Sequence, residues 1–183
     1  MNGKKTGLII LDGWGHGDKT KSDVIHHANT PFIDSLYQKH PNCELKTFGE
    51  HVGLPKGQMG NSEVGHLNIG AGRIVYQDLA KINIACKDNS IAEMGNLKAS
   101  FAYAKHNNKA LHFIGLVSDG GIHSHTNHLY KLCELANKEG VEKVFVHAFT
   151  DGRDCDPKSG KGFIQELEQN LFGAKIASVC GRY

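Results

Sequence analysis

Residues 111–149, LHFIGLVSDGGIHSHTNHLYKLCELANKEGVEKVFVHAF, decide the fold of this chain. Apolar runs at residues 111–117 and 144–149 predict two strands. Between them, apolar residues recur at helical spacing from Leu129 to Ala136, and Gly140 follows as a helix cap. Strands separated by a helix of this length pair in parallel, because the crossover returns the chain to the same edge of the sheet. This stretch therefore predicts an α/β fold.

The same alternation continues on both sides of that stretch. Downstream, Ser159 opens a helical pattern that Gly173 closes, and residues 176–179 begin a further strand. Upstream, residues 6–11 have the pattern of a buried strand, and Thr30-Pro31 is a favourable helix start. We therefore expect a mainly parallel sheet with helices on both faces.

Composition restricts the class of protein. The 183 residues are 39% hydrophobic, and the net charge of +2 gives no electrostatic footprint for nucleic acid or a membrane surface. The aliphatic run at residues 8–11 is too short to span a bilayer, and residues 1–5 lack a secretory signal. Five cysteines without CxxC spacing are typical of reduced thiols. We expect a cytoplasmic protein with no nucleic-acid or membrane partner.

Polar clusters follow the predicted strands, where parallel sheets place their sites. Four strand ends carry such residues: Asp12, residues 118–123, residues 151–154, and Arg182. Asp12 lies in a glycine-rich turn suited to a hard divalent cation. An aspartate that bonds only its own turn is an equally good interpretation of the same pattern.

Ser62 lies in residues 60–66, GNSEVGH, at a predicted helix start. Backbone N–H groups at a helix start favour an attached phosphate, although an ordinary N-cap serine is the more usual role there. The segment is not a nucleophile elbow, because Val64 replaces the required glycine. The chain also contains no P-loop motif.

Histidines at positions 123, 125 and 128 could suggest a zinc site. We favour a single functional histidine, His123, with the other two capping the following helix or facing outward. Arg153 could bind a carboxylate or phosphate, and Asp154 could act as a general acid or base. A loop salt bridge is the alternative for both. The residues alone indicate a phosphate-handling or metal-dependent α/β enzyme.

Residues 57–73, GQMGNSEVGHLNIGAGR, resemble cofactor-independent (2,3-bisphosphoglycerate-independent) phosphoglycerate mutase, a family of the alkaline phosphatase superfamily. Further matches occur in family order along the chain: LIILDGWG at 8–15, SDGGIHSH at 118–125, HAFTDGRD at 147–154 and CGRY at 180–183. The resemblance implies an isomerase that interconverts 3-phosphoglycerate and 2-phosphoglycerate in glycolysis and gluconeogenesis.

The resemblance also implies site roles. Asp12 and Ser62 match metal ligands, and Ser62 matches the nucleophile that becomes a phosphoserine. Two divalent cations, usually Mn²⁺, are implied, without a requirement for 2,3-bisphosphoglycerate. The residues that match substrate-binding positions are His123, Arg153, Asp154 and Arg182. Asp154 is also implied as the proton carrier between the two hydroxyls.

Family members are much longer, and their remaining metal ligands follow the segment matched here. We therefore expect residues 1–76 to be a piece of an alkaline-phosphatase-like metal domain and residues 77–183 to be part of a transferase domain. We expect the chain alone to be inactive, and the full-length protein to be a monomer. The alternatives are a metal-dependent phosphatase or another phosphomutase of the superfamily, and a non-catalytic folding or binding fragment.

Overall fold

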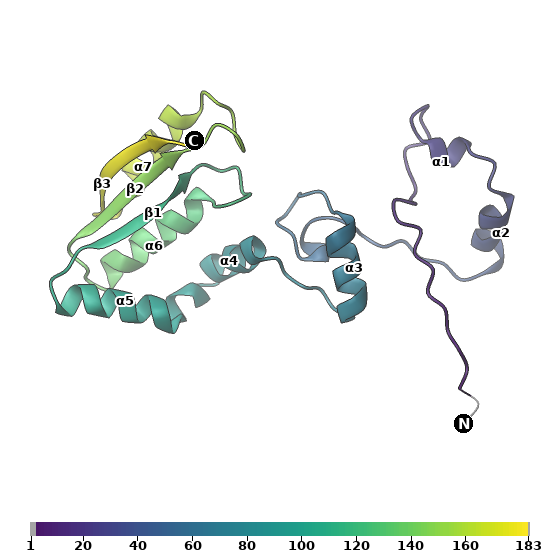
Figure 1. Cartoon of the computed structure of the whole chain (residues 1–183), viewed down its shortest axis with the longest axis horizontal. Coiled ribbons are helices and arrows are strands. Elements are labelled where there is room, and N and C mark those ends of the chain that lie inside the picture. The colour runs from purple at the N-terminus through teal and green to yellow at the C-terminus, as the bar shows by residue number, and fades with distance from the viewer. Residues whose placement is uncertain (1–2, 183) are drawn as a thin grey trace.

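The computed structural model describes residues 3–182, so Tyr183 of the CGRY motif lies outside the described residues. Its sheet contains three strands: β1 (Leu111–Val117), β2 (Val144–Thr150) and β3 (Lys175–Gly181). The order is β1-β2-β3 and both pairings are parallel (Figure 1). The predicted α/β class and parallel sheet are confirmed.

Three helices pack against this sheet: α5 (Gly95–His106), α6 (Thr126–Lys138) and α7 (Gly160–Gln169). After α6, Gly140 has a left-handed backbone (φ +77°), which is the conformation expected of a glycine that closes a helix. The apolar face of α6 is buried at Cys133 and Ala136, and α7 contributes Leu167. These side chains join the strands in one hydrophobic core.

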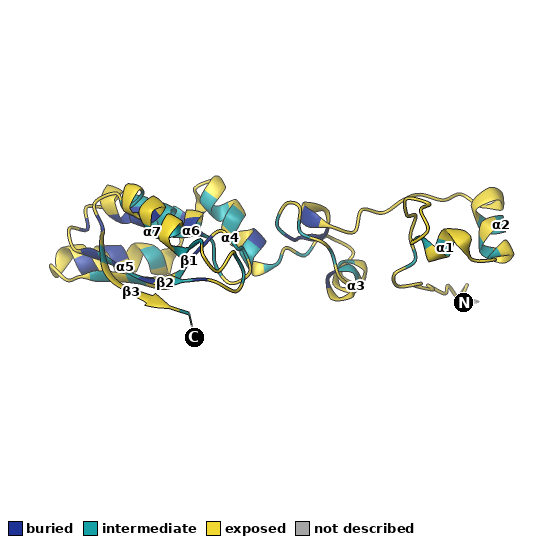
Figure 2. Ribbon diagram, turned by 90° about the horizontal axis from the view of Figure 1, so that it is seen from above, coloured by how far each residue is buried: buried dark blue, intermediate teal, exposed yellow. Residues whose placement is uncertain are grey.

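The two faces of the sheet differ in exposure. Val146 and Ala148 of β2 are each 1% exposed, and the side of the sheet that they face carries α6 and α7 (Figure 2). On the alternate positions, Ile114 is 69% exposed and Phe149 is 37% exposed. The expectation of helices on both faces is thus met on one face, while the described residues leave the other open.

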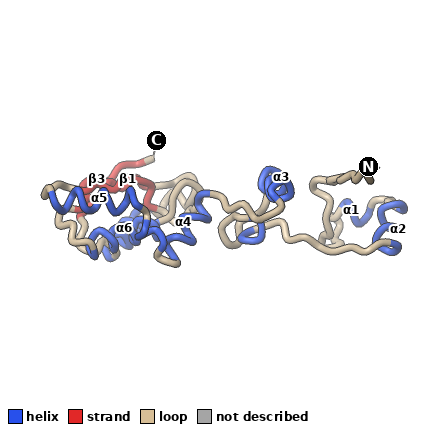
Figure 3. Tube along the Cα trace, turned by 90° about the horizontal axis from the view of Figure 1, so that it is seen from below, coloured by secondary structure: helices blue, strands red, loops and turns tan. Residues whose placement is uncertain are grey.

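The N-terminal half is helical and carries little core. Its elements are α1 (Val24–His27), α2 (Pro31–Lys39), η1 (Gly49–Val52), α3 (Ser62–Ala71), α4 (Asp78–Lys87) and η2 (Ser90–Glu93). Long loops connect α2 to η1 and η1 to α3 (Figure 3). A small cluster of Val52, Leu54 and Val64 packs η1 against α3. Among residues 3–182, none of the helices combines the length and the apolar character required to cross a bilayer.

The strand predicted at residues 6–11 does not form, and this prediction was wrong. Leu8 and Ile9 are 73% and 85% exposed. A strand forms only when its N–H and C=O groups pair with a neighbour, and none of the three strands in the described sheet pairs with this segment. The expected domain boundary between residues 76 and 77 coincides with the start of α4 and stays a prediction.

Candidate functional site

Ser62 and Asp12 lie together although 50 residues separate them in sequence. The N-cap of α3 is Asn61, whose side chain accepts a hydrogen bond from the Val64 N–H at 2.9 Å. The Ser62 hydroxyl is therefore not needed as a cap, and it donates to Asp12 Oδ2 at 2.5 Å. This arrangement replaces the interpretation of Ser62 as an ordinary N-cap serine.

His66 is a third member of this group, and it was not predicted. Its Nδ1 lies 2.8 Å from the Ser62 carbonyl oxygen and 3.2 Å from Ser62 Oγ. A carbonyl only accepts hydrogen bonds, so Nδ1 carries the proton and presents it to both oxygens. The i,i+4 spacing of Ser62 and His66 on a helix was the available sequence signal.

The donor chemistry of the pair fits a metal ligand set in part. Asp12 and Ser62 offer a carboxylate and a hydroxyl, the oxygen donors that hard divalent cations prefer. Within residues 3–182, no cluster of three His, Cys, Asp or Glu side chains could hold a metal ion. The pair thus fits as two ligands of a cation rather than as a complete set.

A second polar cluster lies at the carboxyl ends of the three strands. Asp151, directly after β2, is its centre. Ser118, which follows β1, donates to Asp151 Oδ2 at 2.9 Å. Arg182, which follows β3, donates from Nη1 to Asp151 Oδ1 at 3.0 Å and to Asp154 Oδ2 at 2.7 Å. The parallel topology brings these ends to one edge, as the sequence predicted.

The structure brings together three of the four residues that the sequence predicts to bind substrate. His123 Nε2 lies 3.7 Å from Asp154 Oδ2, so His123, Asp154 and Arg182 are brought together. Arg153 is exposed and donates its backbone N–H to Asp151 Oδ1 at 3.0 Å. Its guanidinium makes no hydrogen bond or ion pair within residues 3–182.

Asp151 was not predicted as a site residue. Burial alone would raise its pKa, but the backbone N–H groups of Arg153, Gly152 and Asp154 and the Ser118 hydroxyl act more strongly. They hold the pKa of this carboxyl well below its usual range. In turn, hydrogen bonds to Asp154 and Asp151 raise the pKa of Arg182. Asp151 and Arg182 therefore both stay charged across the physiological pH range.

The three histidines between residues 123 and 128 have three different partners. His123 faces Asp154, whereas His125 caps α6 by accepting from the Asn127 N–H at 3.2 Å. His128 Nε2 lies 2.5 Å from Asn83 Oδ1 on α4, and burial, together with the charge of His125, lowers its pKa. Of the three, His123 alone contacts Asp154, and its role in the site stays a prediction; His128 packs against α4 instead of capping a helix or facing outward.

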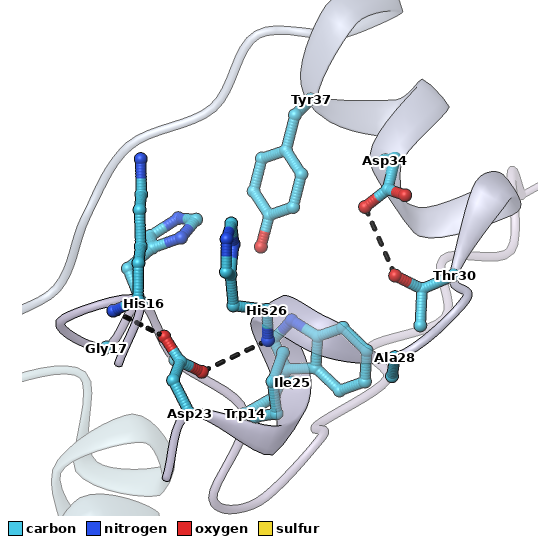
Figure 4. A pocket seen from close by; sticks show the side chains of 12 residues that line it. Trp14, His16, Gly17, Asp23, Ile25, His26, Ala28, Thr30, Asp34 and Tyr37 are labelled. Carbon is cyan, nitrogen blue, oxygen red and sulfur yellow. Dashed lines mark hydrogen bonds between the residues drawn. The ribbon is translucent and has the colours of Figure 1, made fainter. Parts of the chain in front are cut away.

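A pocket lies between the glycine-rich loop after Asp12 and helices α1 and α2 (Figure 4). Trp14, His16, His26 and Tyr37 line it. The ring centroids of His16 and Tyr37 lie 5.2 Å apart. None of the predicted site residues lines this pocket, so it is separate from both polar groups.

Comparisons with known proteins give a consistent result. Residues 82–183 match the family model described as the BPG-independent PGAM N-terminus. The chain is 62% identical over 182 residues to a 2,3-bisphosphoglycerate-independent phosphoglycerate mutase of Parabacteroides distasonis, covering 98% of this chain and 36% of that protein. A protein of the same description from Staphylococcus aureus is 50% identical over 186 residues, with 100% and 37% covered.

A solved structure supports the same relationship. The phosphoglycerate mutase of Leishmania mexicana, crystallised at low cobalt concentration, superposes with a TM-score of 0.61 at 37% sequence identity. The match covers 92% of this chain and 32% of that chain. The chain thus spans roughly a third of the length of the relatives that it matches. On these matches, the chain belongs to the BPG-independent phosphoglycerate mutase family, with residues 82–183 corresponding to its N-terminal region.

Proposed function

We propose that this chain supplies the nucleophile and part of the substrate site of an enzyme that interconverts 3-phosphoglycerate and 2-phosphoglycerate. The observation that carries the proposal is the contact between the Ser62 hydroxyl and Asp12 Oδ2, 2.5 Å long. It joins two of the motifs that resemble the family, and it leaves the serine oxygen oriented by a carboxylate. The reaction is an intramolecular phosphoryl transfer in glycolysis and gluconeogenesis.

Ser62 receives the phosphoryl group in this proposal. Its hydroxyl is a weak nucleophile, and Asp12 and His66 orient it from two sides. The N–H groups at the start of α3 favour the negative charge of a phosphate attached there. A divalent cation on Asp12 and Ser62 would act as a Lewis acid and favour the serine alkoxide. We propose two such cations, Mn²⁺ by family resemblance, and no requirement for 2,3-bisphosphoglycerate.

The strand-end cluster holds the glycerate while Ser62 carries the phosphate. Arg182 and the exposed Arg153 side chain provide positive charge for an anionic substrate. His123 can donate a hydrogen bond, and Asp154 carries a proton between the 2- and 3-hydroxyls. Keeping the glycerate bound distinguishes a mutase from a phosphatase, because a lost glycerate leaves the phosphoserine to water.

A metal-dependent phosphatase or another phosphomutase would use the same serine. The test is a chimera in which residues 1–183 replace the matching segment of the Parabacteroides distasonis relative. We expect this chimera to form 2-phosphoglycerate from 3-phosphoglycerate with little free phosphate, both measured by ³¹P NMR. A chimera that releases mainly inorganic phosphate would contradict the mutase proposal.

The 183-residue chain by itself is proposed to be inactive, because Asp12 and Ser62 provide only part of a metal site. We expect no 2-phosphoglycerate from the purified chain with Mn²⁺, in the assay that detects turnover by the chimera. Measurable turnover would refute the proposed inactivity of the chain. It would also refute the alternative that the chain is a non-catalytic folding or binding fragment. We also propose that the complete protein is a cytoplasmic monomer. Sedimentation velocity of the chimera would test the monomeric state.

A further inference from the structure

We propose that Asp151 is a positioning residue that holds Arg182 and the Gly152–Asp154 loop in their binding geometry. This inference rests on the proposed function, since it concerns residues assigned there to the substrate. Asp151 follows β2, the central strand, so it lies between the ends of β1 and β3. No other described carboxylate bonds groups that follow all three strands.

The two carboxylate oxygens of Asp151 accept different sets of hydrogen bonds. Oδ1 accepts from the backbone N–H groups of Gly152, Arg153 and Asp154 at 2.8, 3.0 and 3.2 Å. The same oxygen accepts from Arg182 Nη1 at 3.0 Å. Oδ2 accepts from the Ser118 hydroxyl, which is itself buried. One carboxylate therefore fixes the loop that carries Asp154 and the arginine that contacts it.

Burial makes this arrangement rigid and keeps Asp151 from acting on substrate directly. The Asp151 side chain is 1% exposed, whereas those of Arg182 and Asp154 are 21% and 14% exposed. A buried carboxylate needs full hydrogen bonding and a cationic partner, and Asp151 has both. Asp151 thus acts through its neighbours, which reach the solvent edge of the site.

A purely local turn role is the competing explanation, and the chain offers a matched control for it. Asp156 lies five residues downstream and also accepts from a backbone N–H, that of Lys158 at 2.7 Å. Asp156 is exposed and makes no contact with Arg182 among the described side chains. Asp156→Asn therefore removes an aspartate charge from this loop and leaves the contact between Asp151 and Arg182 in place.

The first test is a double-mutant cycle in the chimera. Asp151→Asn keeps an oxygen for the three backbone N–H groups but removes the charge that pairs with Arg182. We expect it to raise KM for 3-phosphoglycerate about tenfold, the loss typical of a hydrogen bond to a charged group. In an Arg182→Ala background the same change should alter KM by less than about twofold, because the coupled partner is gone. Asp156→Asn should leave KM unchanged.

An equal rise in KM for Asp151→Asn in both backgrounds would overturn the proposal, since Asp151 would not act through Arg182.

A second measurement on the 183-residue chain does not depend on activity. We expect Asp151→Ala to speed amide hydrogen exchange at residues 152–154 about tenfold or more while β2 keeps its protection. Unchanged exchange at residues 152–154 would also overturn it. A chimera without mutase activity would contradict the proposed function, and the exchange result would still decide the role of Asp151.

Discussion

Asp151 couples the stability of the α/β unit to pH. Hydrogen bonds hold its pKa below the usual range in the folded state. The stabilisation is therefore complete above the unfolded pKa of about 3.9 and is lost as the pH falls below that value. We expect the free energy of unfolding to fall more steeply between about pH 5 and pH 3 for the wild type than for Asp151→Asn, in urea titrations. An equal loss of unfolding free energy in the wild type and in Asp151→Asn over this pH range would contradict the link between Asp151 and stability.

Cys133 is the buried thiol of the core. Burial raises its pKa to about 11, so its reactive thiolate is scarce near neutral pH. Cys43 and Cys180 are exposed. We expect iodoacetamide at neutral pH to alkylate Cys43 and Cys180 readily and to modify Cys133 only after denaturation, as read by peptide mass spectrometry. Alkylation of Cys133 at the same rate as Cys43 would show that the core is open.

At the residue scale, the sequence motifs named side chains that the structure brings together, whereas the roles assigned to them stay predictions. Ser62 with Asp12, and Asp154 with Arg182, are found in contact. Asp151 was missed because a turn aspartate and a buried acceptor of five hydrogen bonds have the same local pattern. Only the positions of three strand ends in space distinguish the two.

At the scale of elements, Gly60 fixes the approach to α3. A Cβ at this position would overlap the backbone carbonyl of Thr47, which cannot move aside cheaply. Gly65 lies within α3, and a Cβ there would meet nothing within 4 Å. We expect Gly60→Ala to speed hydrogen exchange at the Val64 amide, and Gly65→Ala to slow it by adding up to about 1 kcal/mol of helix stability. Similar behaviour of both variants would contradict this packing.

Strand prediction shows where the sequence pattern is sufficient. The apolar run at residues 111–117 forms β1 with the predicted bounds, because β2 pairs with it along its length. Residues 6–11 carry an equally apolar run but remain unpaired and exposed. An apolar run reports that a segment is suited to burial, whereas a strand also requires a partner, and the pattern does not contain that information.

At the scale of the whole molecule, two cores differ greatly in size. The core around the sheet joins α5, α6 and α7, whereas the N-terminal core consists of Val52, Leu54 and Val64. We expect residues 3–48 to be cleaved first in limited proteolysis and a fragment containing residues 95–182 to persist. Mass spectrometry of the products would identify both. A stable product containing residues 3–48 would contradict this distribution of stability.

The central claim is that Ser62 carries the phosphoryl group, and phosphopeptide mapping tests it most directly. The chimera would be mixed with 3-phosphoglycerate and Mn²⁺, quenched in acid during turnover, and digested for mass spectrometry. We predict phosphate on Ser62, its absence in Ser62→Ala, and its retention in the control Ser35→Ala, which changes a serine of α2 outside both polar groups. Phosphate on another residue, or 2-phosphoglycerate formed by Ser62→Ala, would contradict the account.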